Sequence, residues 1–395
     1  MKFFRYSNTI AVLCCMFLLG ACKDSNDGIP GWPWEEDTDE PEQQVEVKPR
    51  FVWIDAAANF PDYANSKENI ERDLTKAKEA GFTDVVVDVR PTMGDVLFQT
   101  SIVEQVKKLD YWSDNGYAYF ERTATWDYLQ AFIDAGHKLG LKVNASINTF
   151  VGGNLYPYGL GEQGLLFRDS SKKEWATTLN LEGGLTNAMD MTAANDPDNV
   201  YGTKFLNPAN DEVQQFVLQL LGDLAKYDID GIFLDRCRYN DFASDFSAIS
   251  KQKFEEYIGE TVETFPMISL SRECLLSIAF SAAKYMKQWL EFRAKVIHDF
   301  IAKARDKVKS VNPDLRFGVY VGAWYSTYYE VGVNWASPKY DTSAEYPNWA
   351  TAKYKDYGYA ICSTLCCLAP MLLLMKYMGA ESGICKVSVQ MPKSC

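Results

Sequence analysis

Apolar runs of strand length alternate with amphipathic helical segments along much of the chain. The strand candidates are residues 50–55, 84–90, 141–148, 231–234 and 315–322. Helical spacing of apolar residues marks 67–80, 125–139, 212–227 and 284–310, and glycines 81 and 140 directly follow the first two helices as caps. Strands that alternate with helices in this way predict right-handed βαβ units and a parallel sheet.

This pattern predicts an α/β fold of the (β/α)8 TIM-barrel type. A complete barrel takes about 250 residues or more. Here the loops are long, above all 149–209, and five strands already occupy residues 50–322. We therefore expect an incomplete barrel with five to six βα units, inside a domain that spans residues 49–360.

The character of the chain changes after residue 360. Residues 361–395 contain five of the ten cysteines, an apolar run rich in Leu and Met, and Glu381 as their single acid. We expect this Cys- and Met-rich tail to be a frameshifted translation that truncates the barrel, and a genuine apolar tail is the alternative. Residues 267–282 differ from their flanks in the same way, less clearly.

The first 22 residues have the pattern of a secretory signal. Lys2 and Arg5 precede an apolar run over 10–19, which is shorter than the ~20 residues that a bilayer-crossing helix needs. The sequence Leu-Gly-Ala-Cys at its end resembles a bacterial lipobox, so Cys22 would carry the lipid. Residues 23–48 are acidic, contain several prolines and predict a flexible tether. We expect a membrane-anchored lipoprotein of the outer membrane, exposed at the cell surface; a periplasm-facing anchor and an ordinary cleaved signal are the alternatives.

Composition narrows the possible partners. A net charge of −13 without a basic cluster argues against nucleic acid, because neutralised phosphates supply most of that affinity. Aromatic residues make up 14% of the chain, which suits stacking on sugar rings, although core packing uses them too. His137 and His298 are the only histidines and both fall in predicted helices, so Ser-His or Cys-His catalysis and histidine metal sites lack parts. We expect no cofactor and no metal; residues 195–199 offer a weak pattern for calcium.

Polar side chains gather where the predicted strands end. A barrel carries its function at the carboxyl ends of its strands, and alternate residues of a strand share one face. Asp88 and Arg90 would then share a face, as would Asn144 and Asn148. The residues at these ends are Asp55, Asp88, Arg90, Asn144, Asn148, Asp235 to Asp241, Tyr320 and Trp324.

Four segments carry a family resemblance. Asp88–Asp95 (DVRPTMGD), Leu206–Asp211 (LNPAND) and Asp230–Asp235 (DGIFLD) resemble signature blocks of the glycosyl-hydrolase-like 10 family, and Asn312–Gly318 (NPDLRFG) is a looser match. The resemblance covers residues 50–360 and implies a TIM-barrel lipoprotein that acts on glycans. That family commonly has a second acid directly after the fourth-strand aspartate, where this chain has Arg236, so the identity of a catalytic pair stays open.

Glycoside hydrolysis needs two carboxyl groups. Asp235 is the first candidate, and Glu330, Asp241 and Asp88 are the alternatives for the second. The candidates for binding substrate are Asp88, Arg90, Asp95, Asn148, Asn207, Arg238, Tyr239 and Trp324.

Structural roles compete with each of these assignments. Asp235 could pair with Arg236 or Arg238, and Arg90 with Asp88. Asp95 could make a turn, Asn207 could start the next helix, and Asn148 could bind loop backbone. The expected activity is hydrolysis of an extracellular polysaccharide or cell-wall glycan, and a non-catalytic glycan-binding surface lipoprotein is the alternative; the oligomeric state is left open.

Overall fold

We analysed a computed structural model of the chain, which describes residues 48–113, 116–156, 160–263, 265, 285–362, 365–369 and 385–387. These residues all belong to one compact unit that begins at Lys48. The predicted signal, the predicted lipidation site Cys22 and nearly all of the predicted tether lie outside the described residues, as does most of the Cys- and Met-rich tail. Within the described part of the chain, no helix has both the length and the apolar character needed to cross a membrane.

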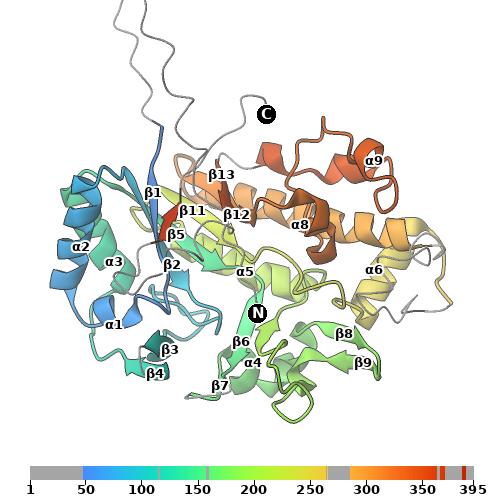
Figure 1. The fold of residues 1–395 in the computed structure, drawn as a ribbon, viewed down its shortest axis with the longest axis horizontal. Coiled ribbons are helices and arrows are strands. Elements are labelled where there is room, and N and C mark those ends of the chain that lie inside the picture. The colour runs from blue at the N-terminus through green and yellow to red at the C-terminus, as the bar shows by residue number, and fades with distance from the viewer. Residues whose placement is uncertain are drawn as a thin grey trace, which may run out of the picture. The chain divides into compact units, whose positions relative to one another are not determined.

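A seven-stranded sheet forms the centre of this unit (Figure 1). Its strand order is β13-β12-β11-β5-β2-β1-β14, and all neighbours are parallel except β14, which runs antiparallel to β1. The strands are β1 (Phe51–Ile54), β2 (Asp84–Arg90), β5 (Lys142–Asn148), β11 (Gly231–Asp235), β12 (Arg316–Gly322), β13 (Leu365–Ala369) and β14 (Cys385–Val387). The predicted parallel α/β sheet in chain order is confirmed. Two strands, β13 and β14, come from the segment in which no βα pattern was expected.

The sheet is strongly curled. Trp53 on β1 and Tyr320 on β12 are separated by three strands, so in a flat sheet they would lie about 19 Å apart. Their ring centroids are 4.7 Å apart. The described strands therefore form a half-barrel, with β13 and β14 as its edges. The assignment to an incomplete barrel of the (β/α)8 TIM type stays a prediction.

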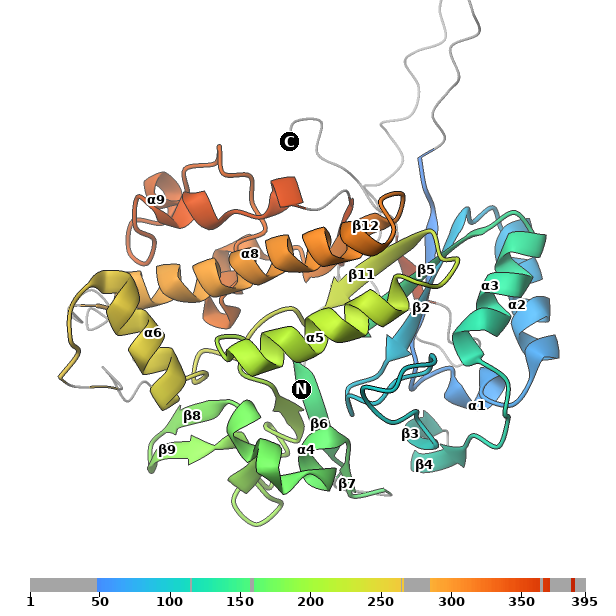
Figure 2. The ribbon, with the colours of Figure 1, turned by 180° about the vertical axis from the view of Figure 1, so that it is seen from behind.

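The outer face of the sheet is apolar and helices cover it. They are α2 (Lys67–Glu79), α3 (Tyr128–Lys138), α5 (Asp211–Leu224) and α8 (Met286–Val311). Helix α2 packs on α3 and α5 packs on α8, as Figure 2 shows from behind. Outward side chains such as Val87, Ile147 and Leu234 join the main apolar core.

Local sequence explains where these helices begin and end. Ser66, Asp127 and Asn210 cap the first turns of α2, α3 and α5 by accepting backbone N–H bonds. Gly81 and Gly140 follow α2 and α3 with φ of 84° and 65°, the left-handed conformation that glycine adopts without strain. The prediction of these two glycine caps is confirmed.

The inner face of the curled sheet has three layers. Asp84, Asn144 and Arg316 form a polar layer at the amino ends of the strands. An aromatic layer follows, in which Phe51 and Trp53 pack edge-on against Phe233. The third layer lies at the carboxyl ends and is again polar.

Small insertions occupy the loops after the carboxyl ends of β2 and β5. They are β3 (Lys108–Ser113) with β4 (Gly116–Glu121); β6 (Val151–Leu155) with β7 (Glu162–Gln163) and β10 (Thr203–Phe205); and β8 (Thr178–Leu181) with β9 (Gly184–Asn187). Short helices complete the unit: α1 (Phe60–Tyr63), α4 (Leu165–Arg168), α6 (Ala248–Ile258), α9 (Thr342–Glu345), and the 3-10 helices η1 (Ser170–Trp175), η2 (Ala188–Asp190), η4 (Tyr325–Val331), η5 (Tyr354–Tyr357) and η6 (Ala360–Cys362). None of these elements was predicted.

The weak calcium pattern at 195–199 proves to be a loop organised by an ammonium group. The carboxylate of Asp196 accepts the backbone N–H groups of Val200 and Tyr201. Buried Lys204 donates from Nζ to the carbonyl oxygens of Ala188, Met191 and Tyr201 at 2.7–2.9 Å. Among the described residues, no three His, Cys, Asp or Glu side chains are arranged to hold a metal ion.

Candidate active site

Three carboxylates stand at the carboxyl edge of the sheet. Asp55 follows β1, Asp88 lies near the end of β2, and Asp235 ends β11. In the register of the sheet, Asp88 is opposite Ser146 and Asp235 is opposite Asn148, both on the intervening strand β5. These strand ends lie close together in the curled sheet. Asp55 and Asp235 are both near enough to Asp88 to act on it electrostatically.

Asn148 links Asp88 to Asp235, in the second case through Arg236. Its Nδ2 donates to Asp88 Oδ2 at 3.2 Å and to the Arg90 carbonyl at 2.8 Å, and its Oδ1 accepts from Arg236 Nε at 2.9 Å. The backbone N–H of Arg236 in turn donates to Asp235 Oδ1 at 2.6 Å. Asp88, Asn148, Arg236 and Asp235 therefore form one hydrogen-bonded chain, which we call the edge network.

Arg236 adopts an unusual backbone conformation in this network. Its φ is 45°, in the left-handed region that few residues with a side chain enter. This turn directs its guanidinium to Asn148 and leaves its carbonyl to accept the N–H of Phe150. Strained backbone of this kind is frequent at functional sites.

The network places its two carboxyl groups in different environments. Burial, together with the charges of Asp55 and Asp235, raises the pKa of Asp88 from 3.8 to about 8. Burial also raises the pKa of Asp235, but Arg236 and Arg238 oppose that rise. At neutral pH Asp88 thus holds a proton, whereas Asp235 faces two cations that favour its charged form.

Aromatic side chains border the network on the β12 side. Trp324 follows β12, is 40% exposed, and packs edge-on against Tyr328 at 5.8 Å. Tyr328 lies within electrostatic reach of Asp235 and Arg238, and its hydroxyl accepts the N–H of Gly322. Trp324 therefore contacts a tyrosine that lies within reach of Asp235, and its exposed ring offers a surface on which a sugar can stack.

Arg90 does not share the face of Asp88, contrary to the prediction. The register shifts between these residues, so Asp88 is opposite Ser146 whereas Arg90 is opposite Ile147, an outer-face residue. Arg90 is completely buried and donates to the carbonyl oxygens of Asn148, Thr149 and Val151. These bonds hold the turn after β5, and no ion pair between Arg90 and Asp88 is seen among the described residues; a contact of Arg90 with substrate stays a prediction.

Asp95 and Asn207 also bind protein groups away from the edge network. Asp95 forms a two-pronged ion pair with Arg168, at 2.5 and 2.7 Å, which fixes α4 to the loop after β2. Asn207 is fully buried and donates to Asp245 Oδ2 and Ser247 Oγ. Neither side chain is available to a substrate.

The remaining candidates lie beyond β11 and β12. Arg238 donates to the carbonyl oxygens of Tyr239 and Asn240, yet its charge still acts on Asp235. Tyr239 is fully buried, with the Arg293 guanidinium 4.5 Å from its ring, so it is a core residue.

The two other acids considered as the second carboxyl stand apart from Asp88. Asp241 is hydrogen-bonded to Tyr201 and accepts the N–H of Ala243. Glu330 lies on η4, where its carbonyl oxygen accepts from Arg293. Neither takes part in the edge network.

Two residues of the site were not among the predicted site residues. Asp55 directly follows its strand, and the strand-end rule includes it, but the sequence assigns it no role. Arg236 stands out in the sequence as a departure from a family pattern and as a possible partner of Asp235, whereas its contact with Asn148 depends on a backbone turn that sequence does not reveal.

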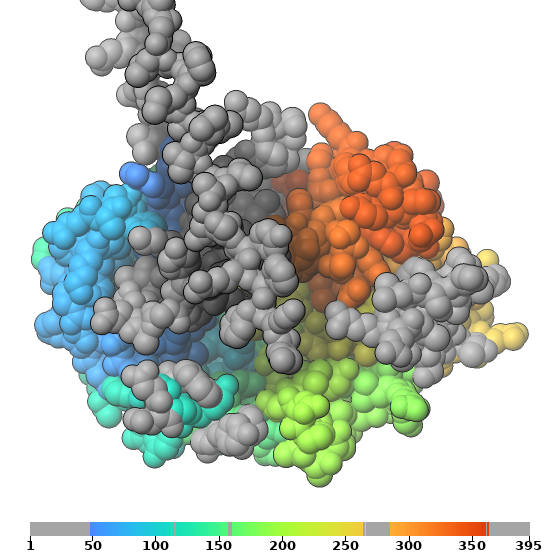
Figure 3. Space-filling view, viewed as in Figure 1, coloured from blue at the N-terminus to red at the C-terminus, as the bar shows by residue number. Residues whose placement is uncertain are grey.

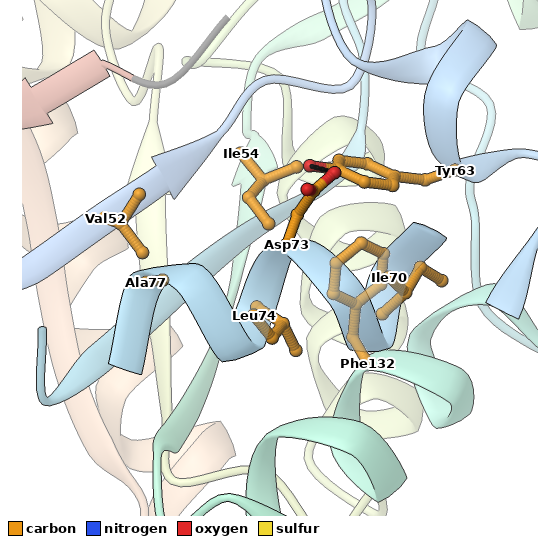
Figure 4. Close-up of a pocket in the computed structure, with 8 residues that line it drawn as sticks. All are labelled: Val52, Ile54, Tyr63, Ile70, Asp73, Leu74, Ala77 and Phe132. Carbon is orange, nitrogen blue, oxygen red and sulfur yellow. Dashed lines mark hydrogen bonds between the residues drawn. The ribbon is translucent and has the colours of Figure 1, made fainter. Parts of the chain in front are cut away.

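One small cavity lies on the other side of the sheet, between β1 and helices α1, α2 and α3 (Figure 4). Its volume is about 280 Å³ including open solvent, and its lining is mainly apolar. The Tyr63 hydroxyl points toward Asp73 at 3.4 Å, and Arg72 and Lys76 already bind that carboxylate. It is a gap in helix packing on the outer face of the sheet, and no residue of the edge network lines it.

Comparisons with known proteins identify a matching family and a relative. The sequence model of the family described as Glycosyl hydrolase-like 10 matches residues 48–357. An S-layer-related protein of Niallia circulans is 30% identical over 310 residues, which are 73% of this chain but only 18% of that protein's length.

Solved structures give weaker likenesses. An α-L-fucosidase isoenzyme 2 of Paenibacillus thiaminolyticus has a TM-score of 0.41 at 16% identity, with 68% of this chain and 32% of that one covered. A β-galactosidase of Marinomonas ef1 has a TM-score of 0.43 at 11% identity, with 71% and 38% covered. Both scores are below 0.5, so neither likeness decides a substrate or a mechanism.

Proposed function

The chain belongs to the glycosyl hydrolase-like 10 family, and from this premise we propose that it hydrolyses glycosidic bonds in an extracellular polysaccharide or cell-wall glycan. The observation that carries the proposal is the pairing of Asp88 with Asp235 through Asn148 and Arg236. Glycoside hydrolysis uses two carboxyl groups whose surroundings give them different pKa values, so that one can act as an acid and the other as a nucleophile or base.

The proposed roles follow from the environments. Asp88, protonated at neutral pH, donates its proton to the glycosidic oxygen as the bond to the leaving sugar breaks. Asp235, beside the Arg236 and Arg238 cations that oppose the rise of its pKa by burial, in its ionised form either attacks the anomeric carbon or takes the proton of an attacking water. Asn148 and Arg236 act as positioning residues that keep the two groups oriented.

Four neutral substitutions test these assignments. Asp88→Asn and Asp235→Asn should each lower kcat by about a thousandfold, in the range that acid–base and nucleophilic roles contribute. Asp241→Asn and Glu330→Gln serve as matched controls and should retain activity, because neither acid belongs to the edge network. The readout is the release of reducing ends from a panel of polysaccharides, and an active Asp88→Asn beside an inactive Glu330→Gln would overturn the pairing.

A non-catalytic glycan-binding role is the second candidate, and Arg236 favours it. This residue stands where the family commonly has another acid, and it places a cation beside Asp235. A binder would retain a glycan without cleaving it. Wild-type protein that binds members of the panel but releases no reducing ends from any of them would decide for this role.

We further propose that Cys22 is lipidated and anchors the protein to the outer membrane, at the cell surface. The lipobox-like residues before it and the acidic segment after it support this location. Cys22→Ala should abolish labelling by a radioactive fatty acid and move the protein out of the membrane fraction. Labelling that persists in the variant would contradict lipidation at this cysteine.

A further inference from the structure

The β3–β4 hairpin presents an aromatic face to solvent. It belongs to the loop that leaves the carboxyl end of β2, the side of a βα sheet on which substrates bind. Side chains of β4 alternate between half-buried and exposed, and Tyr117 and Tyr119 are 51% and 55% exposed on the same face. Figure 3 shows the teal part of the chain, to which β3 and β4 belong, at the surface of the molecule.

Neighbouring charges hold this face in place. The Lys108 ammonium lies 5.6 Å from the centre of the Tyr119 ring and 3.6 Å from the Glu121 carboxylate. The lysine charge is therefore already compensated on the hairpin itself. A rigid aromatic ring beside a neutralised charge suits stacking on an uncharged sugar.

A buried acceptor without a partner lies on the same face. Asp110 is directly opposite Tyr119 in the antiparallel register, and opposed residues of such a pair share one face. Asp110 is only 3% exposed, and its Oδ2 receives one long bond, from the N–H of Leu160 at 3.4 Å. Its Oδ1 has no hydrogen-bond partner among the described residues. Buried acceptors are seldom left unpaired, so this atom points to a ligand that donates a hydrogen bond.

The face continues toward the catalytic edge through Tyr156. This tyrosine follows β6 and lies within electrostatic reach of Asp110 and Tyr117. Its hydroxyl is hydrogen-bonded to the side chains of Asn154 and Thr92, and Thr92 lies two residues after the end of β2. Tyr156 thus connects the hairpin face, through Tyr117 and Asp110, to the loop that follows β2.

We propose that Lys108, Asp110, Tyr117, Tyr119 and Tyr156 form a distal subsite that binds uncharged sugar residues of a glycan whose cleavable bond lies at the edge network. The position of the cleavable bond at the edge network rests on the proposed function, whereas the binding of sugars at the hairpin does not. Sugar rings stack on the tyrosines and a sugar hydroxyl donates to Asp110 Oδ1. A negatively charged glycan is disfavoured because Asp110 and Glu121 lie on this face and the whole chain carries a charge of −13.

Native gels that contain a polysaccharide test the subsite independently of turnover. The probes are mixed-linkage β-glucan, galactomannan and, as the charged polymer, polygalacturonate. The Asp235→Asn protein should be retarded by at least one neutral polymer, and adding Tyr117→Ala with Tyr119→Ala should weaken that retention by about tenfold. Leu185→Ala, which removes a 47% exposed side chain from the β8–β9 hairpin, is the matched control and should not change it.

Asp110→Ala supplies a readout that a structural role would not give. Removing an unpaired buried carboxylate should leave the melting temperature unchanged or higher, while retention by the neutral polymer falls. A variant that melts earlier and binds as before would show that Asp110 only supports the hairpin.

Each outcome decides the proposal. Equal retention of the tyrosine variant and its parent, retention by polygalacturonate alone, or no retention by any polymer overturns the subsite. If the wild-type protein proves inactive but the tyrosine variant still loses retention, the proposed hydrolysis fails and the binding site stands. If the protein is active, the tyrosine variant should raise KM more for long chains than for short ones, and an effect independent of chain length would contradict a distal subsite.

Discussion

Burial of Asp88 makes the stability of the fold depend on pH. The folded state keeps the proton of this carboxyl up to a pKa of about 8, whereas the ordinary value is 3.8. Its contribution to stability is therefore complete below about pH 4 and is lost as the pH rises toward 8, at up to about 1.4 kcal/mol per pH unit. The free energy of unfolding in urea should fall over this window in the wild type and change less in Asp88→Asn.

Asp228→Asn is the control for this measurement, because its side chain is 91% exposed and should not alter the pH dependence. Identical pH dependence in the wild type and Asp88→Asn would contradict a protonated Asp88. If the protein is active, loss of the same proton should also lower kcat/KM above about pH 8.

Arg236 offers a second test at the scale of one residue. A left-handed backbone costs a residue with a side chain about 1–2 kcal/mol, and glycine avoids that cost. Arg236→Gly and Arg236→Ala both lose the bond to Asn148, so their difference reports on the backbone alone. We expect the glycine variant to be about 1 kcal/mol more stable in urea unfolding, the reverse of the usual order. An alanine variant of equal or higher stability would show that the φ of 45° carries no strain.

The residues at strand ends could be selected from sequence, but their roles could not. Asp88, Asn148 and Asp235 were chosen because each ends or nearly ends a buried strand, and the structure joins them in one network. Arg90 was misjudged because a shift in register after Asp88 breaks the strict alternation of side chains. Such a shift leaves no mark in the pattern of polar and apolar residues.

At the scale of elements, Lys204 on β10 organises the long loop before it. Its ammonium binds three backbone carbonyl oxygens in a fully buried position. Lys204→Met should lower the free energy of unfolding by about 3 kcal/mol or more, since each buried acceptor left unpaired costs about 1–3 kcal/mol. Hydrogen exchange should rise first in residues 188–204, which identifies the loss as local.

Lys226→Met is the matched control for that substitution. Its side chain is 67% exposed and pairs only with Asp223 at the surface, so the change should stay within about 0.5 kcal/mol. A Lys204 variant as stable as this control would mean that the loop does not depend on the buried ammonium.

The βα units were predictable because long buried runs and well-capped helices leave clear periodic signals. All seven residues of β2 are buried, and a valine-rich run of this length predicts a buried strand without information from the rest of the chain. The hairpins β3–β4 and β8–β9 depend instead on pairing with each other over few residues. Helix α6 buries only Ser250 and Phe254, so its sequence has little amphipathic periodicity to detect.

For the whole unit, the decisive feature is the curl that brings strands distant in the sheet into contact. Sequence indicates which residues face inward, but it does not state how tightly the sheet closes. The closeness of Trp53 to Tyr320 and of Asp84 to Arg316 both follow from that closure. The approach of Asp55 and Asp235 to Asp88 depends on it as well, since the three carboxylates stand at the ends of three different strands.

The polar layer at the amino ends of the strands is where this dependence can be measured. Arg316 on β12 reaches across to Asp84 on β2 and to Asn144 on β5, and the Asp84 side chain is only 2% exposed. Arg316→Met leaves that carboxylate buried without its cation, so unfolding should become easier by about 3–5 kcal/mol. Asp84→Asn in the same chain should restore part of the loss, because the uncompensated charge is then gone. Arg305→Met, which removes an exposed partner of Asp306, is the control and should change little. The pair lies at the opposite end of the strands from the carboxylates. A parallel loss of the pH dependence between about pH 4 and about pH 8 that is assigned to Asp88 would therefore show that closure of the sheet sets the edge network. Additive single and double effects would show instead that Arg316 and Asp84 act independently.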